Sequence, residues 1–111
     1  MEPHASLTNT YVVHFEGAFD GHIKEPTAEM EKMIMEQEGL TLVFDFEKLS
    51  FLNSYAIGQL VAWHNHMMNT QSKIIIAAPA KNVEDIFNIV GITNMFKIFP
   101  DVQSSIDSLG S

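Results

Sequence analysis

The sequence predicts a single α/β domain with a mixed sheet of about four or five short strands and about four helices. Short runs rich in β-branched and apolar residues alternate along the chain with longer segments whose apolar residues recur every three or four positions. This alternation favours parallel or mixed strand pairing with helices packed on the sheet. No linker, repeat or low-complexity segment divides the 111 residues, so we expect residues 1–111 to form one domain with a modest core.

The first half of the chain predicts two strands, a shorter optional strand before them, and one helix. Thr10 to Phe15 is rich in β-forming residues, and a shorter strand can precede it at Ala5 to Leu7. The turn-prone stretch from Gly17 to Gly21 leads to a helix from Glu25-Pro26 to Glu38, because proline suits a first helical turn and a glycine follows the end. Leu40 to Phe46 is a nearly continuous apolar run, which is typical of a covered strand. The predicted apolar face of the helix consists of Ile23, Pro26, Met30, Met33 and Ile34.

A second helix is predicted from Ser54 to about Asn69. Trp63 is offset from the apolar stripe of this helix, so we expect either a boundary residue at the edge of the core or a member of a partner-facing patch. The stripe itself consists of Ile57, Leu60, Val61, His64 and Met68.

The last part of the chain continues the alternation. Lys73 to Ala78 reads as a buried strand and Lys97 to Phe99 as a short final one. Ala80 to Val90 is predicted to be a helix that ends at Gly91, and a last helix runs from Pro100-Asp101 to Leu109. The inward positions of these two helices are expected to be Val83, Ile86, Phe87 and Val90, then Val102, Ile106 and Leu109.

Charge and composition argue against several classes of function. Fourteen acidic residues and six basic ones give a formal net charge of −8, which disfavours binding to nucleic acid or to anionic membranes. There is no cysteine, no apolar run of the roughly 20 residues that span a bilayer, and no signal-peptide pattern at the start. We therefore expect a cytoplasmic protein without membrane insertion.

Neither a metal site nor an enzyme is expected. His64 and His66 are two positions apart on a predicted helix and would point about 200° away from each other, which is wrong for a ligand pair. The carboxylate pairs Asp45 with Glu47 and Glu84 with Asp85 lack an evident base or nucleophile. The chain also has no glycine-rich phosphate loop and no Gly-x-Ser-x-Gly elbow. No cofactor is expected.

Ser54 lies where a strand and a polar turn give way to a helix. The first N–H groups of a helix lack partners within the helix and carry the positive end of its dipole, so they stabilise an anion. The serine can act as the N-cap, worth about 1 kcal/mol. It can also carry a phosphate that a partner protein reads. The residues alone leave both interpretations open.

Several segments together resemble one protein family. The stretch Asn53-Ser54-Tyr55-Ala56-Ile57-Gly58 stands in the place of an Asp-Ser-[Ser/Thr/Ala]-Gly-Leu-Gly signature. The other matching segments are Gly17-Ala18-Phe19-Asp20, the run from Val43 to Leu52, Ile89-Val90-Gly91-Ile92 and Phe96-Lys97-Ile98-Phe99-Pro100. In their order and spacing, these segments resemble the STAS domain family, whose simplest members are bacterial anti-sigma factor antagonists.

The resemblance implies a role in partner switching. A serine kinase that also acts as an anti-sigma-type regulator would phosphorylate Ser54 and would bind only the unphosphorylated form. A serine phosphatase would reset the system. The resemblance places Asp20, Asn53, Tyr55 and Gly58 with Ser54 in the docking surface.

Two departures from the family pattern keep other roles open. Asn53 replaces the family's aspartate, and Tyr55-Ala56 replaces a small residue followed by glycine. The changes are compatible with a specialised kinase, or with a non-phosphorylated adaptor subunit of a transporter or sensory complex. A ligand-binding sensor domain is a third class, and it would need an internal apolar pocket.

Overall fold

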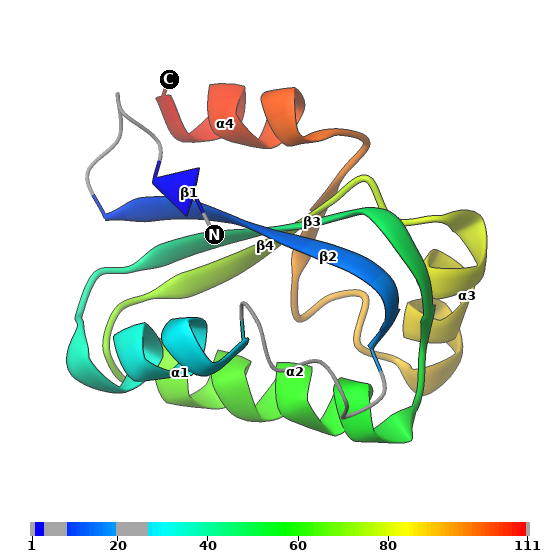
Figure 1. Ribbon diagram of the computed structural model, residues 1–111, viewed down its shortest axis with the longest axis horizontal. Helices are drawn as coiled ribbons and strands as arrows, with labels where there is room; N and C mark the ends of the chain where they lie inside the picture. The colour runs from blue at the N-terminus through cyan, green and yellow to red at the C-terminus, as the bar shows by residue number, and fades with distance from the viewer. Residues whose placement is uncertain (1, 4–8, 20–26, 111) are drawn as a thin grey trace.

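The computed structural model describes residues 2–3, 9–19 and 27–110. These residues form one α/β domain (Figure 1), which confirms the predicted fold class. In chain order the elements are β1 (Glu2–Pro3), β2 (Thr10–Phe19), α1 (Thr27–Glu36), β3 (Thr41–Leu52), α2 (Ser54–Met68), β4 (Lys73–Ala77), α3 (Lys81–Val90), β5 (Lys97–Phe99) and α4 (Val102–Gly110).

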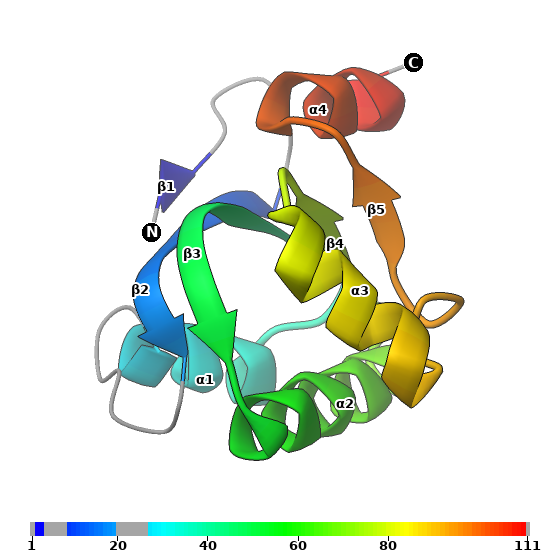
Figure 2. The same ribbon diagram turned by 90° about the vertical axis from the view of Figure 1, so that its right-hand side faces the viewer.

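The five strands lie in the sheet in their sequence order. β2, β3, β4 and β5 are mutually parallel, and β1 pairs antiparallel with β2 at one edge. Helices α1, α2 and α3 cover one face of the sheet, and α4 covers the other (Figures 1 and 2). Crossover helices place β3 between two parallel neighbours and beneath helices on both sides.

Alternate side chains of β3 therefore enter two separate cores. Leu42, Phe44 and Phe46 point into the larger core beneath α1, α2 and α3. Val43 points into the smaller core, where Ile106 of α4 contacts the sheet. Because successive residues of a strand face opposite sides, a strand with both faces covered needs an unbroken apolar run. This accounts for the apolar run predicted as a strand from Leu40 to Phe46.

Both β2 and β3 are longer than predicted. The ladder between them continues past register shifts at His14/Glu16 and Gly17/Ala18 as far as Phe19 and Leu52. The expected turn beginning at Gly17 is therefore wrong, because that glycine adopts a φ of 70° within the strand. A glycine with positive φ accommodates a bulge without ending the pairing.

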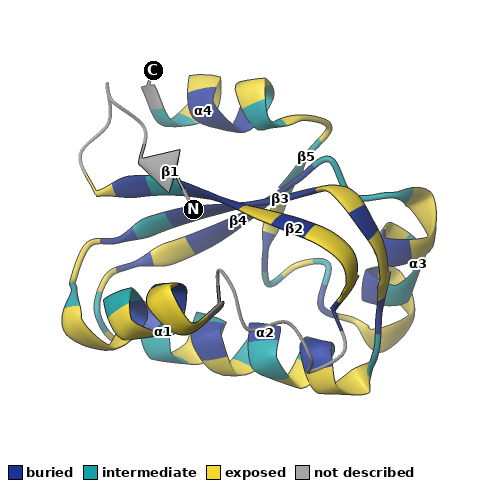
Figure 3. Ribbon diagram, in the orientation of Figure 1, coloured by how far each residue is buried: buried dark blue, intermediate teal, exposed yellow. Residues whose placement is uncertain are grey.

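The buried face of α2 also differs from the predicted stripe. Leu60 is buried as predicted, but the other buried residues are Ala56, Trp63 and Met67, so the buried face is turned by about one residue, or 100°. Figure 3 shows buried and exposed segments alternating along α2. Trp63 stacks on Phe19, with 5.9 Å between ring centroids, and meets the ring of Phe44 edge-on. Burying the largest side chain of the helix outweighs the better periodicity of the smaller ones. Ile57, Val61 and His64 are consequently half-buried, and Met68 is exposed.

The remaining elements agree with the sequence to within a few residues. Gly91 has a φ of 78° and ends α3 as predicted, although Val90 is exposed and not inward. In α1, Met30 and Ile34 are buried as expected, and the helix ends at Glu36. The expected strand at residues 5–7 lies outside the described residues, as do Ile23 and Pro26 of the predicted helix face.

Two adjacent methionines test the orientation of α2. The side chain of Met67 is 1% exposed and that of Met68 is 64% exposed. We expect Met67→Ala to lower the free energy of unfolding by about 2–5 kcal/mol, and Met68→Ala to change it by no more than about 0.5 kcal/mol. Urea denaturation of both variants measures the difference. Equal losses would contradict this orientation.

A carboxylate that caps α4 makes the stability of the fold depend on pH. Asp101 Oδ1 accepts the N–H of Ser104 at 2.7 Å, and this hydrogen bond holds the pKa of the carboxyl below its ordinary value. A lowered folded-state pKa stabilises the fold above the unfolded-state pKa, and the contribution is lost as the pH falls through the folded-state pKa. We expect acidification below about pH 4 to destabilise the natural protein more than Asp101→Asn, which keeps a capping oxygen but does not titrate. Urea denaturation near neutral pH and in acid compares the two, and parallel pH dependence would contradict this role of the carboxylate.

Candidate functional site

One residue separates the end of β3 from the start of α2. Leu52 ends the strand and is buried, Asn53 has an extended backbone, and Ser54 is the first residue of the helix. The N–H of Asn53 donates to the carbonyl oxygen of Phe19 at 3.3 Å, which ties this junction to the end of β2. Figure 2 shows β3 leading directly into α2. The sheet therefore fixes where the helix begins.

Asn53, and not Ser54, caps the helix. Its Oδ1 accepts the N–H of Ala56 at 3.0 Å, and its carbonyl oxygen accepts the N–H of Ile57 at 3.1 Å. The interpretation of Ser54 as the N-cap is therefore wrong by one residue, since asparagine caps as well as serine. Ser54 is exposed, and its hydroxyl makes no hydrogen bond within the described part of the chain.

The electrostatic surroundings of Ser54 favour an added negative charge. The first turn of α2 contains no acidic residue, and the cap is an uncharged amide. The free N–H groups and the positive end of the helix dipole therefore face this position, and no carboxylate of the helix's own first turn offsets them. An anion carried by the Ser54 oxygen would be stabilised locally even though the chain as a whole is acidic.

Two exposed aromatic side chains flank Ser54. Phe51 is 47% exposed and Tyr55 is 53% exposed. Gly58, one turn into the helix, is exposed, and a Cβ built on it would meet nothing within 4 Å. The open space at Gly58 lets another protein approach the helix backbone closely. We call Phe51, Asn53, Ser54, Tyr55 and Gly58 the helix-start surface.

The structure brings four of the predicted partner-binding residues together in the helix-start surface. They are Asn53, Ser54, Tyr55 and Gly58, and their binding of a partner stays a prediction. Asp20 lies outside the described residues. Sequence reasoning missed Phe51, because the strand that exposes it was predicted to end five residues earlier.

Hydrogen bonds from neighbouring elements support the helix-start surface. The hydroxyl of Ser50 donates to the carbonyl oxygen of Gly17 at 3.0 Å. The side-chain amide of Asn82, at the start of α3, donates to the carbonyl oxygen of Ser50 at 3.0 Å. The end of β3 is thus hydrogen-bonded to both β2 and α3. These bonds hold in place the residues that precede Ser54.

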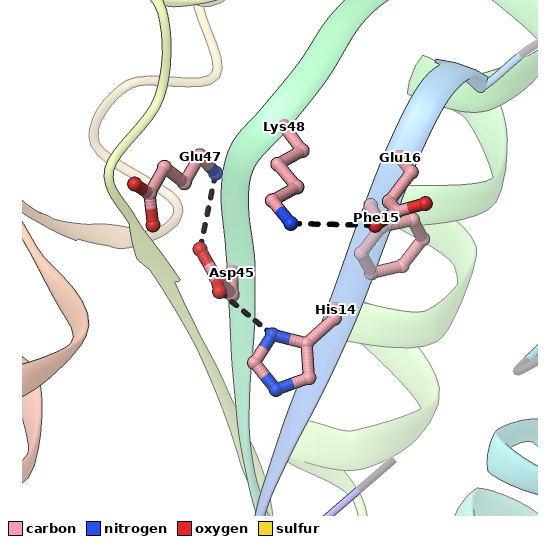
Figure 4. A pocket seen from close by; sticks show the side chains of 6 residues that line it. All are labelled: His14, Phe15, Glu16, Asp45, Glu47 and Lys48. Carbon is pink, nitrogen blue, oxygen red and sulfur yellow. Dashed lines mark hydrogen bonds and ion pairs between the residues drawn. The ribbon is translucent and has the colours of Figure 1, made fainter.

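A separate polar pocket of about 340 Å³ lies at the first register shift of the ladder between β2 and β3 (Figure 4). His14 Nδ1 and Asp45 Oδ2 are 2.7 Å apart, and Asp45 Oδ1 accepts the N–H of Glu47 at 3.0 Å. Lys48 and Glu16 form an exposed ion pair at 3.7 Å. β3 has one more residue than β2 at this point, so the Asp45 carboxylate holds a backbone N–H that faces no ladder partner. We therefore assign this buried carboxylate a structural role, which is to stabilise the irregular backbone of β3.

Within residues 2–3, 9–19 and 27–110, no three His, Asp or Glu side chains are grouped closely enough to hold a metal ion. Over the same residues, no helix has the length and apolar character needed to cross a membrane.

Substitutions at the junction test which residue is the cap. We expect Asn53→Ala to lower the free energy of unfolding by about 1 kcal/mol or more, because the N–H of Ala56 loses its acceptor. Ser54→Ala should change it by no more than about 0.5 kcal/mol. Asn53→Asp, which keeps the acceptor, should retain the stability of the natural protein. Thermal or urea unfolding would contradict this assignment if Ser54→Ala proved the costlier change.

Comparison with known proteins gives a family match and several similar folds. The sequence model of the STAS domain matches residues 5–105. The anti-sigma factor antagonist SpoIIAA in its unphosphorylated form superposes with a TM-score of 0.78 at 20% identity, over 96% of this chain and 92% of that one. The phosphorylated form of SpoIIAA from Bacillus gives 0.74 at 20% identity, over 96% of both chains. The STAS domain of a SulP transporter from Vibrio cholerae gives 0.77 at 14% identity, over 93% of this chain and 82% of that one. At these identities the likeness establishes the fold.

Proposed function

Because the chain belongs to the STAS domain family, we propose that it is a non-enzymatic regulatory module that exchanges protein partners under the control of phosphorylation at Ser54. The observation that carries the proposal is the state of the Ser54 hydroxyl. It is exposed, it is released from capping by Asn53, and it stands at the positive end of α2 with no acidic residue in the first turn.

Phosphorylation would change this surface in two opposing ways. A phosphate adds about 1.5 to 2 negative charges at neutral pH, and the start of the helix would stabilise them by about 0.3–1 kcal/mol. A partner packed on Phe51 and Tyr55 around a neutral hydroxyl would meet a hydrated dianion instead. Burying that charge without a cation is costly, so the partner would be released while the fold is kept.

The partner that fits this scheme is a serine kinase that also acts as an anti-sigma-type regulator in the cytoplasm. Such a kinase binds the unphosphorylated surface, modifies Ser54 and leaves, and a serine phosphatase restores binding. One of the similar folds is an anti-sigma factor antagonist described in both an unphosphorylated and a phosphorylated form. The existence of these two forms supports this role for the present chain by analogy.

The departure at Asn53 bears on which kinase is used. Asn53 keeps the capping oxygen that an aspartate would supply, so the helix start is preserved. It removes one negative charge next to the acceptor serine. We expect the cognate kinase to contact the uncharged side-chain amide of Asn53 and the exposed ring of Tyr55.

A constitutive adaptor is the alternative function. The domain is about as similar in fold to the STAS domain of a SulP transporter as to the antagonist. In that role the helix-start surface would bind its partner permanently, and Ser54 would stay unmodified.

Charge placed at Ser54 separates the two functions. We expect Ser54→Ala to capture a kinase-fold partner from the native host and Ser54→Asp to lose at least about tenfold in affinity, which corresponds to 1.4 kcal/mol. Affinity capture with mass spectrometric identification, followed by titration with the purified partner, measures this. Gln103→Glu is the matched control, because it adds the same charge on α4, on the other face of the sheet.

The outcomes divide clearly. Loss of the partner with Ser54→Asp but not with Gln103→Glu would support switching at the helix-start surface. Equal affinity of all three variants for one partner would contradict the switch and favour the adaptor.

A further inference from the structure

A second pocket, of about 370 Å³, lies beside the C-terminal half of α2, away from Ser54. It is an open pocket bordered by α2, the beginning of β4 and the segment that leads into β5, and Figure 2 shows that segment beside the end of α2. The side chains that matter for its chemistry are His64, Met68, Lys73, Asn94, Met95 and Lys97. The volume is within the range of about 300–1,000 Å³ that is usual for small-molecule sites.

The pocket is basic in an otherwise acidic chain. Two of the six basic residues, Lys73 and Lys97, line it, and no acidic residue does. Neither lysine has a carboxylate within ion-pair distance in the described part of the chain. Lys48 and Lys81, in contrast, pair with Glu16 and Asp85. Two like charges brought to one pocket repel each other unless an anion joins them.

Sheet register places the two lysines near each other. Lys97 lies opposite Ile75 in the parallel ladder between β4 and β5, and Lys73 precedes Ile75 by two residues. Two residues of a strand span about 6.6 Å, and neighbouring strands are about 4.8 Å apart. Both side chains start on the face that α4 covers, as that of Ile75 does. They border the pocket at the part of β4 that precedes its pairing with β5. Flexible lysine side chains bridge this distance easily when both reach toward one anion.

The other walls of the pocket are apolar or neutral. The ring of His64 is held edge-on against Phe96, with 5.3 Å between centroids. Met68 is exposed and Met95 is half-buried, so thioether surface is open to the pocket. The exposed side-chain amide of Asn94 can donate a hydrogen bond. A ligand with a charged head and a small apolar body matches this combination.

We propose that this pocket binds a small organic dianion, an oxyanion head such as a phosphate monoester attached to an apolar body. Lys73 and Lys97 neutralise the two charges, Asn94 donates to an oxygen, and Met68, Met95 and the His64 ring contact the apolar body. The carbonyl end of α2 repels an anion, and two ammonium groups outweigh that partial charge. His64 lies about 15 Å along the helix from Ser54, so the site is separate from the helix-start surface.

Titration of the isotope-labelled full chain with phenyl phosphate, followed by amide NMR shifts, tests the proposal. We expect saturable shifts at residues 72–75 and 94–97, weakened by added salt. Lys73→Gln and Lys97→Gln should each weaken binding by roughly three- to tenfold, the scale of one typical net hydrogen bond. Lys32→Gln is the matched control, because Lys32 is exposed on α1, outside the pocket, and should leave the affinity unchanged.

Two further probes distinguish the contribution of the charged head to binding from that of the apolar body. Phenol has the apolar body without the charge and should not shift these amides, and inorganic phosphate should bind more weakly than phenyl phosphate. Absence of saturable shifts would overturn the proposal, as would unchanged binding to a Lys73→Gln/Lys97→Gln double variant whose melting curve matches that of the natural protein. Equal binding of phenol, or of inorganic phosphate, would also overturn it.

Discussion

The position of Ser54 depends on the burial of β3. This strand has parallel neighbours on both sides and helices over both faces, so a slip of one residue would move the side chains of each core into the other core. Because only Asn53 separates the strand from α2, the sheet sets the first turn of the helix directly. Hydrogen bonds from Ser50 to Gly17 and from Asn82 to Ser50 then fix the same junction to β2 and α3. A rigid core in this way presents an exposed hydroxyl at a defined place.

The junction divides two tasks between adjacent residues. Asn53 satisfies an N–H of the first turn, which stabilises the helix, and Ser54 is left with an exposed hydroxyl. The stability of the fold therefore does not depend on the Ser54 oxygen, and that oxygen can be modified without loss of the cap. The adjoining Phe51 and Tyr55 supply apolar area for a partner whose binding is sensitive to charge at this point. Stability and regulation are thus carried by different side chains of one turn.

Much of the fold could be predicted from the sequence, because strand and helix periodicities are strong and glycine or proline marks most boundaries. The start of α2 at Ser54 and the bounds of β5 were predicted correctly. The buried face of α2 was not, since the choice between adjacent stripes depends on the space that Phe19 and Phe44 leave for Trp63. The N-cap was predicted at the wrong residue because asparagine and serine are about equally favoured as N-caps, and the sequence does not distinguish them. The exposure of Phe51 and the basic pocket arise from tertiary placement, as Lys97 is far from both His64 and Lys73 in the chain.

The most direct test of the account is to map phosphate on the protein purified from its own host. Intact-mass and peptide mass spectrometry, across growth and stress conditions and beside a Ser54→Ala strain, would locate any modification. The account predicts a phosphate on the peptide that contains Ser54, varying with conditions and absent from the alanine strain. A protein that stays unmodified at Ser54 under all conditions, while still bound to a serine kinase, would contradict it.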